Sequence, residues 1–427
     1  MKMRAATPRK GERGQTIALV AASLVALLGM AALSIDVVTL YVARGEAQRA
    51  ADAAALAGAK MFSISSFSTR PGSFTPSEVC SSAGPGSSAA ANKLAEAVAG
   101  ENSVSNQAAA VTNIVCDLSR LGNPQVTVTV KRDNLPTFFS RIWSSANTSV
   151  SATAVAEAYN ASGQVVTAKV KGVKPWLLPN CDLTGSLPGC SSANQFVDPS
   201  TGAIAQGGTF IGTQIPLTRI NTLNPPTTPV PGSFYPLDLK STSRSCPSAT
   251  SPSCDNVGTN DYEDDIACSS NTQVSCGPVP TATMSVLIAG PGYGVRTRRG
   301  ARCLIHAESE GSGNGQDDIA VGSPPIRIQG GSRNPISALF GENVSRSDSV
   351  ITVPLYDGGT LCTGAGVCNN PITVVGFLQM AISQTVVFTA TGPQVEGVIL
   401  NAVGCNGTAA GVSAGSTSPV AVRLIHP

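Results

Sequence analysis

A run of twenty uncharged residues near the N-terminus constrains the fold of this chain more than any other feature. The run, TIALVAASLVALLGMAALSI, extends from Thr16 to Ile35. As an α-helix it would be about 30 Å long, the thickness of the hydrocarbon core of a bilayer. A cleaved signal peptide is the alternative, but its apolar core is shorter. Because this run passes directly into a further helical pattern, we expect an uncleaved anchor that continues as a helix over residues 16–60.

Basic residues before the run predict its orientation. Five cations, opposed only by Glu12, lie in the segment 1–15: Lys2, Arg4, Arg9, Lys10 and Arg13. By the positive-inside rule this segment stays in the cytoplasm and everything after the run is exported. Asp36 follows the run directly, and two interpretations are open. An interfacial carboxylate that reaches the headgroups is favoured over a buried intramembrane carboxylate that handles protons or ions.

Alanine recurs every four residues after the run and would form one shallow stripe on a helix. The stripe consists of Ala43, Ala47, Ala51, Ala55 and Ala59. A face without bulky side chains lets another helix approach closely, so the stripe predicts a docking face for partner helices. The alternative is that alanine is simply the best helix former. Arg44, Gln48 and Asp52 form a second stripe, on which Gln48 and Asp52 are spaced to hydrogen-bond.

The order of these residues carries a resemblance to a known family. Gly14 follows a basic residue, and Asp36, Arg44, Gln48 and Asp52 come next, with Asp52 inside the string ADAAALAGA. The first sixty residues thereby resemble the N-terminal segment of TadG-like proteins of the Tad (tight adherence, Flp) pilus-assembly system. The resemblance implies a bacterial inner-membrane protein of a pilus or secretion apparatus. Its implied partners are other Tad pilus-assembly proteins or pilins.

Two departures from the family limit what the resemblance implies. Some pilins of this system are cut after a glycine that a glutamate follows five residues later, whereas this chain has Leu19 and Thr16 at those distances from Gly14 and Gly11. Some larger members carry a metal motif of the form DxSxS. The nearest string here, DPSTG at Asp198, lacks the second serine. Neither processing nor that metal site is therefore expected.

The cysteines indicate an oxidising compartment. All twelve follow the apolar run: Cys80, Cys116, Cys181, Cys190, Cys246, Cys254, Cys268, Cys276, Cys303, Cys362, Cys368 and Cys405. None is spaced as CxxC, so disulfides are favoured over a zinc ribbon or buried free thiols. Neighbouring cysteines suggest small loops, which would pair Cys181 with Cys190, Cys246 with Cys254, Cys268 with Cys276 and Cys362 with Cys368.

The exported part is predicted to be α+β and to contain two units. Residues 61–165 would form a small α+β unit, with a helix at AANKLAEAVAG, strands beginning at Gln125 and Thr148, and helical spacing after Pro136. Residues 170–427 are rich in Pro, Gly and Ser and contain six apolar strand patterns. This second unit is therefore predicted to be β-rich and disulfide-stabilised, as a sandwich or a barrel.

The sequence gives little sign of catalytic chemistry. His306 and His426 are far apart, and the HExxH, GxSxG, Walker A and GxGxxG motifs are absent. We therefore predict no enzyme and no cofactor, and the net charge of +2 predicts no nucleic-acid partner. An acidic cluster, Asp261, Glu263, Asp264 and Asp265, is a weak Ca²⁺ candidate or else an exposed loop. The cluster VRTRRGAR at Val295 suggests a solvated hairpin end or a contact with anionic lipid.

These observations predict a non-enzymatic, membrane-anchored component of Tad-type pilus assembly that docks partner helices through the alanine stripe. The alternative is an anchored binding or adhesin module for a carbohydrate or another surface ligand, in which the helix is only a tether.

Overall fold

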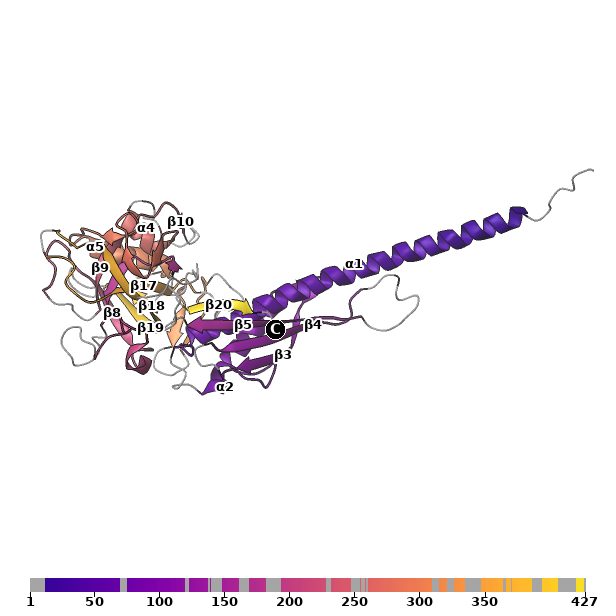
Figure 1. The fold of residues 1–427 in the computed structure, drawn as a ribbon, viewed down its shortest axis with the longest axis horizontal. Helices are drawn as coiled ribbons and strands as arrows, with labels where there is room; N and C mark the ends of the chain where they lie inside the picture. The colour runs from indigo at the N-terminus through magenta and orange to yellow at the C-terminus, as the bar shows by residue number, and fades with distance from the viewer. Residues whose placement is uncertain are drawn as a thin grey trace, which may run out of the picture.

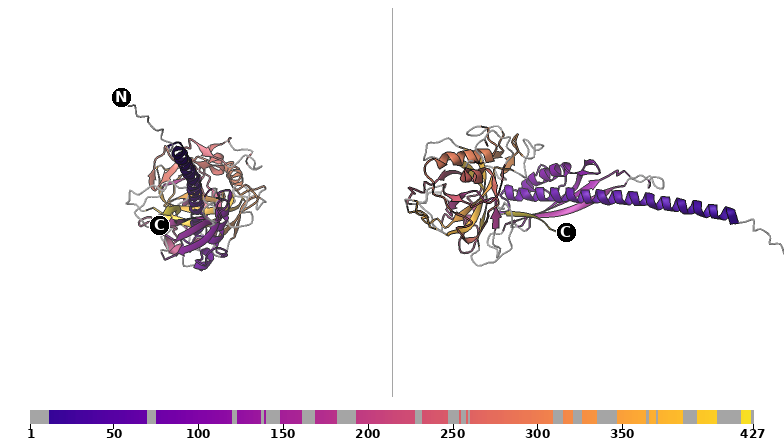
Figure 2. Two further views of the ribbon diagram at one scale, coloured as in Figure 1. Left: turned by 90° about the vertical axis from the view of Figure 1, so that its right-hand side faces the viewer. Right: turned by 90° about the horizontal axis from the view of Figure 1, so that it is seen from above.

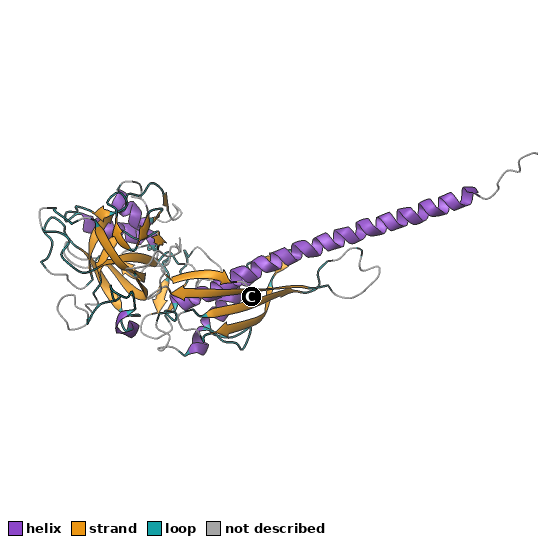
Figure 3. Ribbon diagram, in the orientation of Figure 1, coloured by secondary structure: helices purple, strands orange, loops and turns teal. Residues whose placement is uncertain are grey.

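The computed structural model consists of a long helix and two folded units that follow one another along the axis of the molecule (Figures 1 and 2). Strands dominate both units, whereas the extension is purely helical (Figure 3). The structure describes residues 12–69, 75–119, 123–136, 139, 148–160, 169–181, 193–227, 232–246, 254, 258, 260–308, 315–320, 326–334, 347–363, 366–369, 371–385, 394–405 and 420–425.

Helix α1 spans Glu12–Ile64 and is therefore about 80 Å long. Its first half projects away from the body, and its second half lies within the first unit (Figure 1). The helix ends just before Ser66, whose backbone adopts a left-handed φ of 72°. The predicted continuous helix from the apolar run into the following residues is confirmed.

The first unit is a four-stranded antiparallel sheet in the order β20-β5-β4-β3. The strands are β3 (Ala110–Asp117), β4 (Gln125–Arg132), β5 (Val150–Asn160) and β20 (Val420–Ile425). Helices α1 and α3 (Ala90–Gly100) pack together on the sheet, beside the short elements α2 (Pro76–Val79), β1 (Ser103–Val104) and β2 (Gln107–Ala108). The alternating pattern of β4 buries Val126, Val128 and Val130 against these helices.

Strand β20 corrects the expected division of the chain. The sequence placed residues 170–427 in one β-rich unit, but β20 pairs with β5 and so completes the first sheet. A short apolar strand carries no local signal for the sheet that it joins, because pairing between strands depends on the tertiary structure. The helix expected after Pro136 lies mostly outside the described residues.

The second unit is built on a closed barrel. Its main sheet runs in the order β13-β18-β17-β7-β9-β8-β19, and β19 also pairs with β18, which closes a ring of six strands. The ring consists of β7 (Trp176–Pro179), β8 (Gln214–Arg219), β9 (Ser233–Asp238), β17 (Val350–Tyr356), β18 (Ile372–Thr385) and β19 (Val395–Gly404). Only the pairs β17–β7 and β8–β9 are parallel within this ring. A barrel is one of the two architectures that the strand patterns favoured.

Apolar residues fill the barrel, and two helices extend its core. Alternate residues of the strands, such as Trp176, Leu178 and Phe234, belong to the same cluster as Ile266 of α4 (Asp261–Ala267) and Leu304 of α5 (Tyr293–Leu304). The segment expected as a hairpin end, VRTRRGAR, is therefore helical.

The remaining elements are β6 (Lys169–Lys171), η3 (Ala205–Gly208), β10 (Arg244–Ser245), β11 (Ser269–Ser270), β12 (Gln273–Ser275), β13 (Gly277–Val279), β14 (Ser285–Val286), β15 (Asp318–Ala320) and β16 (Arg327–Gln329).

Five disulfides join described cysteines, and their pairing differs from the small loops that the spacing suggested. The pairs are Cys80–Cys116, Cys246–Cys268, Cys254–Cys303, Cys276–Cys405 and Cys362–Cys368. The expected pairings Cys246/Cys254 and Cys268/Cys276 are wrong, because the fold brings distant cysteines together. Cys362/Cys368 is confirmed. Cys181 is also disulfide-bonded, but its expected partner Cys190 lies outside the described residues.

Candidate functional site

The first half of α1 is exposed over the length of a bilayer. Large apolar side chains point outward from Ile17 onward, including Leu27, Met30 and Val38, each more than half exposed. In the described part of the chain, α1 is the one helix whose length and hydropathy would allow it to cross a membrane. Exposure of this apolar surface to water would be unfavourable, whereas contact with the hydrocarbon of a bilayer would not be.

Asp36 lies at the end of the apolar run but does not face solvent. Its side chain is 3% exposed, and its Oδ2 accepts a hydrogen bond from the backbone N–H of Phe139 at 3.0 Å. Phe139 belongs to the connection between β4 and β5. The structure therefore corrects the expectation of a free interfacial carboxylate: Asp36 is buried and accepts a hydrogen bond from Phe139, 103 residues away.

The predicted docking stripe is buried inside this chain. Each of its alanines is at most 1% exposed: Ala43, Ala47, Ala51, Ala55 and Ala59. They belong to the core that α1 forms with α3, β4 and β5, and β5 presents small residues of its own, such as Ala154 and Ala156. Small side chains do permit close approach here, as the sequence suggested, but the approaching elements are the chain's own. The face assigned to partner helices is thus occupied in this structure.

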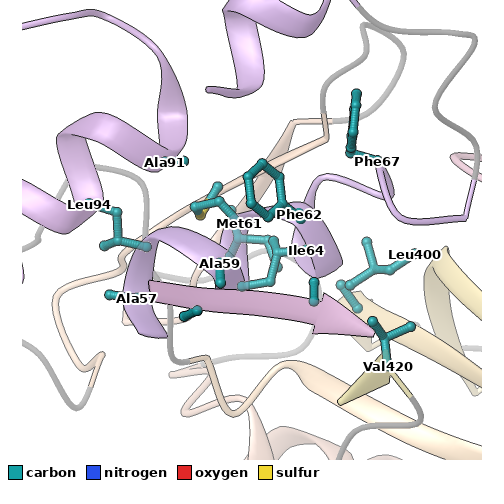
Figure 4. Packing of buried hydrophobic residues seen from close by; sticks show 14 of the residues in the cluster. Ala57, Ala59, Met61, Phe62, Ile64, Phe67, Ala91, Leu94, Leu400 and Val420 are labelled. Carbon is teal, nitrogen blue, oxygen red and sulfur yellow. The ribbon is translucent and has the colours of Figure 1, made fainter. Parts of the chain in front are cut away.

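The close approach is visible at Gly58, near the end of α1. A Cβ at this position would lie 3.3 Å from Cγ1 of Val126 on β4 and 3.6 Å from Cβ of Ala95 on α3. The carbonyl oxygen of Ala91 on α3 would lie 3.5 Å from the same Cβ. Figure 4 shows the neighbouring Ala57 and Ala59 in one buried cluster with Leu94 and Ala91 of α3. The avoidance of bulky residues on this face therefore follows from packing within the unit.

Polar residues on the other stripe of α1 attach it to the sheet. Gln48 donates from Nε2 to Oδ1 of Asp52 at 2.8 Å, so the predicted pair is confirmed. The same Nε2 also donates to the carbonyl oxygen of Thr153 on β5 at 3.3 Å. Glu46 accepts from the N–H of Ser105 at 2.7 Å, whereas Arg44 is exposed. Gly14 lies in the first turns of α1.

A buried polar network connects the end of α1 to the barrel. Asn401 on β19 donates to the carbonyl oxygen of Ser63 at 2.6 Å and to Oε1 of Gln379 on β18 at 2.7 Å. Ser63 donates to the same oxygen of Gln379, and Thr69 donates to Oδ1 of Asn401 at 2.7 Å. Asn160 of β5 donates in turn to Thr69. Since all these bonds are buried or partly buried, they fix how the two units are oriented.

Apolar side chains surround this network. Met61, Phe62 and Phe67 are at most 1% exposed, and Figure 4 shows them at the end of α1. Leu400 of β19 and Val420 of β20 belong to the same core cluster. The junction of the two units at the end of α1 therefore combines apolar burial with specific hydrogen bonds.

The acidic cluster forms a helix and binds cations of the protein itself. Asn260 caps α4 by accepting from the N–H of Glu263. Glu263 pairs with Arg299 through both carboxylate oxygens at 3.0 and 2.6 Å, and Asp265 pairs with Arg244 at 2.6 Å. Asp264 accepts from Gly258 N–H, and Asp261 lies 3.2 Å from Arg244. Donors of the protein itself therefore occupy these carboxylates, and the described residues contain no group of three His, Cys, Asp or Glu suited to a metal ion.

Sequence reasoning missed several buried or partly buried polar groups of the second unit. His306 contacts Asp348 at 2.8 Å between Nε2 and Oδ2. Arg219 is buried and donates to the carbonyl oxygens of Ile220 and Ala289. Lys174 is 3% exposed and donates from Nζ to the carbonyl oxygen of Cys268 at 2.7 Å. No local pattern identifies these residues, because Asp348, Ala289 and Cys268, which they contact, lie on distant segments. His426 lies outside the described residues.

Lys174 predicts a pH dependence of stability. Burial lowers the pKa of Lys174 to about 7, although Asp348 and Asp265 favour the charged form. Between pH 7 and the ordinary lysine pKa, the unfolded chain holds a proton that the folded chain lacks, so the free energy of unfolding rises with pH by up to about 1.4 kcal/mol per unit. Urea unfolding at pH 7, 8 and 9 measures this slope, and Lys174→Met should reduce it. The remaining slope is expected from Lys60, because burial lowers the pKa of Lys60 to about 8.

Lys171→Met is the matched control, because Lys171 is exposed in the same unit. This variant should keep the wild-type slope. An unchanged slope in Lys174→Met would show that another group causes the pH dependence.

Comparison with known families finds a match in helix α1. Residues 14–61 match the family model Tad, described as putative Flp pilus-assembly TadE/G-like. The matched segment begins in the exposed half of α1 and ends in its buried half. No curated protein and no solved structure showed significant similarity to the chain. Residues 14–61 are thus a Tad segment, and the expected resemblance is confirmed for this part of the chain.

Proposed function

We propose that this protein is a single-pass inner-membrane component of a Tad/Flp-type pilus-assembly or secretion apparatus that catalyses no reaction. One observation carries the proposal: the Tad segment is a single helix with a membrane-length exposed half and a half that is built into the folded body. The disulfides fit an oxidising periplasm, and the basic segment before the helix favours a cytoplasmic N-terminus.

The helix would act as a rigid connection between membrane and body. Its buried half packs on the first sheet, and its end is hydrogen-bonded to the barrel through Ser63 and Asn401. A displacement of the membrane half would therefore move both units together. Such a connection suits a scaffold or a spacer in an assembly that spans the envelope.

Partner helices would contact the exposed half of α1, since the alanine stripe is occupied. Ala18, Ala22 and Gly29 share one face of the helix and are exposed. Small residues on one face allow helices to pack closely in a bilayer, where hydrophobic burial does not drive their association. We propose that this face receives the transmembrane helices of other Tad proteins or pilins.

Photo-crosslinking in living cells tests this function. A photoreactive amino acid at Gly29 is expected to give adducts with small alanine-rich proteins of the pilus system. The position tolerates a side chain, because a Cβ there would have no atom within 4 Å. Leu27 is the control, since it lies at nearly the same depth on the opposite face. Absence of protein adducts at both positions would overturn the proposal and favour a tethered adhesin or binding module.

A further inference from the structure

We propose that the end of the barrel beside the start of α5 binds a small oxyanion, a phosphate or a carboxylate group, through the guanidinium of Arg219. The site lies within the second unit, so the proposal does not depend on membrane anchorage or on a role in pilus assembly. Its elements are the unpaired edge of the guanidinium, its unbalanced charge and the adjoining start of α5.

Arg219 points into the barrel. It is the last residue of β8, and the alternation of this strand places it on the same side as Ile215 and Leu217, which belong to the barrel core. Only 6% of Arg219 is exposed. The phenols of Tyr262 on α4 and Tyr293 on α5 are near enough to act on its charge. The guanidinium therefore lies where these two helices cover the barrel.

One edge of the Arg219 guanidinium lacks an acceptor among the described residues. Nη1 donates to the carbonyl oxygens of Ile220 at 2.7 Å and of Ala289 at 3.1 Å. Nε is buried without a hydrogen bond, and Nη2 likewise makes none to the described part of the chain. Together, Nε and Nη2 form an edge that can bind a carboxylate or a phosphate through two parallel hydrogen bonds. The arginine therefore presents an unpaired bidentate edge.

The charge of Arg219 is also unbalanced within the described structure. Burial lowers the pKa of Arg219, and the groups that oppose this effect are the phenols of Tyr262 and Tyr293 rather than a carboxylate. Arginine nevertheless stays protonated in proteins, and a buried cation without a counterion is strongly unfavourable. A water molecule could accept the free hydrogen bonds but would not balance the charge, whereas an oxyanion does both.

The start of α5 attracts an anion to the same place. This helix has no side-chain cap at its N-terminus, and its first turn contains no acidic residue. Gln394 lies between this turn and Arg219: its Oε1 accepts the Arg219 N–H at 2.6 Å, and its side chain is 3.8 Å from the Cβ position of Gly294. Arg296 adds a second cation, 4.7 Å from the centre of the Tyr293 ring. A helix N-terminus with two arginines favours a bound anion.

Fluorescence titration of the full-length protein in detergent tests the site. Trp176 reports on it, because its ring packs on Phe234, the residue that pairs with Arg219 across β8 and β9. The substitution Trp143→Phe leaves Trp176 as the one tryptophan of the chain. Inorganic phosphate or acetate, at an ionic strength held constant with chloride, is expected to give a saturable change in emission. The anion that saturates at the lower concentration identifies whether the site prefers phosphate or carboxylate.

Arg219→Lys keeps the charge but removes the bidentate edge, so the affinity for the anion should fall about ten-fold or more. Arg327→Lys is the matched control, since Arg327 is a partly exposed arginine of β16 in the same unit, and it should titrate like wild type. The same anion should raise the unfolding temperature of wild type and of Arg327→Lys, but not of Arg219→Lys.

Arg296→Gln keeps the test independent of whether Arg219→Lys folds. The substitution removes a partly exposed charge near the site and should weaken binding about two-fold or more. The absence of a saturable response to both anions would overturn the proposal. Wild-type affinity in Arg219→Lys, or in both Arg219→Lys and Arg296→Gln, would also overturn it, because the anion would then bind elsewhere.

Discussion

Replacing Ala51 and Ala54 by leucine is expected to destabilise the first unit by about 1–3 kcal/mol for each substitution. Both alanines are fully buried in the core between α1, α3 and the sheet. A leucine adds three carbon atoms to a tightly packed face. At Gly58, one to two turns further along the helix, even a single added Cβ would lie 3.3 Å from Cγ1 of Val126. The loss is measured as a lower unfolding temperature of the purified protein and as faster proteolysis of the first unit.

Ala22→Leu is the matched control for these substitutions. Ala22 lies on the same helix but is exposed in the apolar half, so the folded units should keep wild-type stability. The experiment also separates two roles of the stripe. If the alanines served a partner helix, Ala51→Leu would leave the isolated protein as stable as wild type and reduce only its association with other proteins.

Removing the Cys276–Cys405 disulfide is expected to have an effect of similar or larger size. The bond joins residues 129 apart, and the chain-entropy account of such a cross-link gives about 5 kcal/mol. Cys276 precedes the edge strand β13 and Cys405 follows β19, so the bond attaches an added strand to the barrel ring. The double variant Cys276→Ala/Cys405→Ala avoids a free thiol, and urea unfolding measures its loss of stability.

The Cys362–Cys368 bond provides the comparison within the same unit. Its sequence separation is 6, for which the same account gives about 2 kcal/mol. The Cys362→Ala/Cys368→Ala variant should therefore lose less than half as much stability as the first pair. Equal losses would mean that the cross-links act through contacts in the folded state rather than through the unfolded chain.

Patterns within a few residues of one another were sufficient to predict several elements. The apolar run and the four-residue alanine spacing predicted α1, and the alternation VTVTV predicted β4, because a helix or a strand is visible in its own periodicity. The spacing of Gln48 and Asp52 likewise predicted their hydrogen bond. Such features can be predicted without knowing which residues pack against them in the folded chain.

The role of the alanine stripe could not be predicted from local patterns alone. Its residues indicate a face that accepts a close neighbour, but they do not say whether the neighbour is another protein or β5 of the same chain. Asp36 is similar, since its place after the apolar run does not reveal that it accepts a hydrogen bond from Phe139. The acidic cluster likewise suggested a cation site, because the sequence does not reveal that Arg299 and Arg244 pair with its carboxylates.

By itself, the sequence determined the long apolar helix, its length relative to a bilayer, the Tad segment and the presence of disulfides. The tertiary structure alone decided the cysteine pairing, the return of β20 to the first sheet, the closure of the barrel and the burial of the alanine stripe. The physical reason is the range of the interactions. Periodicity and charge act between neighbours in the chain, whereas strand pairing, packing and disulfides join residues tens to hundreds of positions apart, where sequence spacing carries no geometric information.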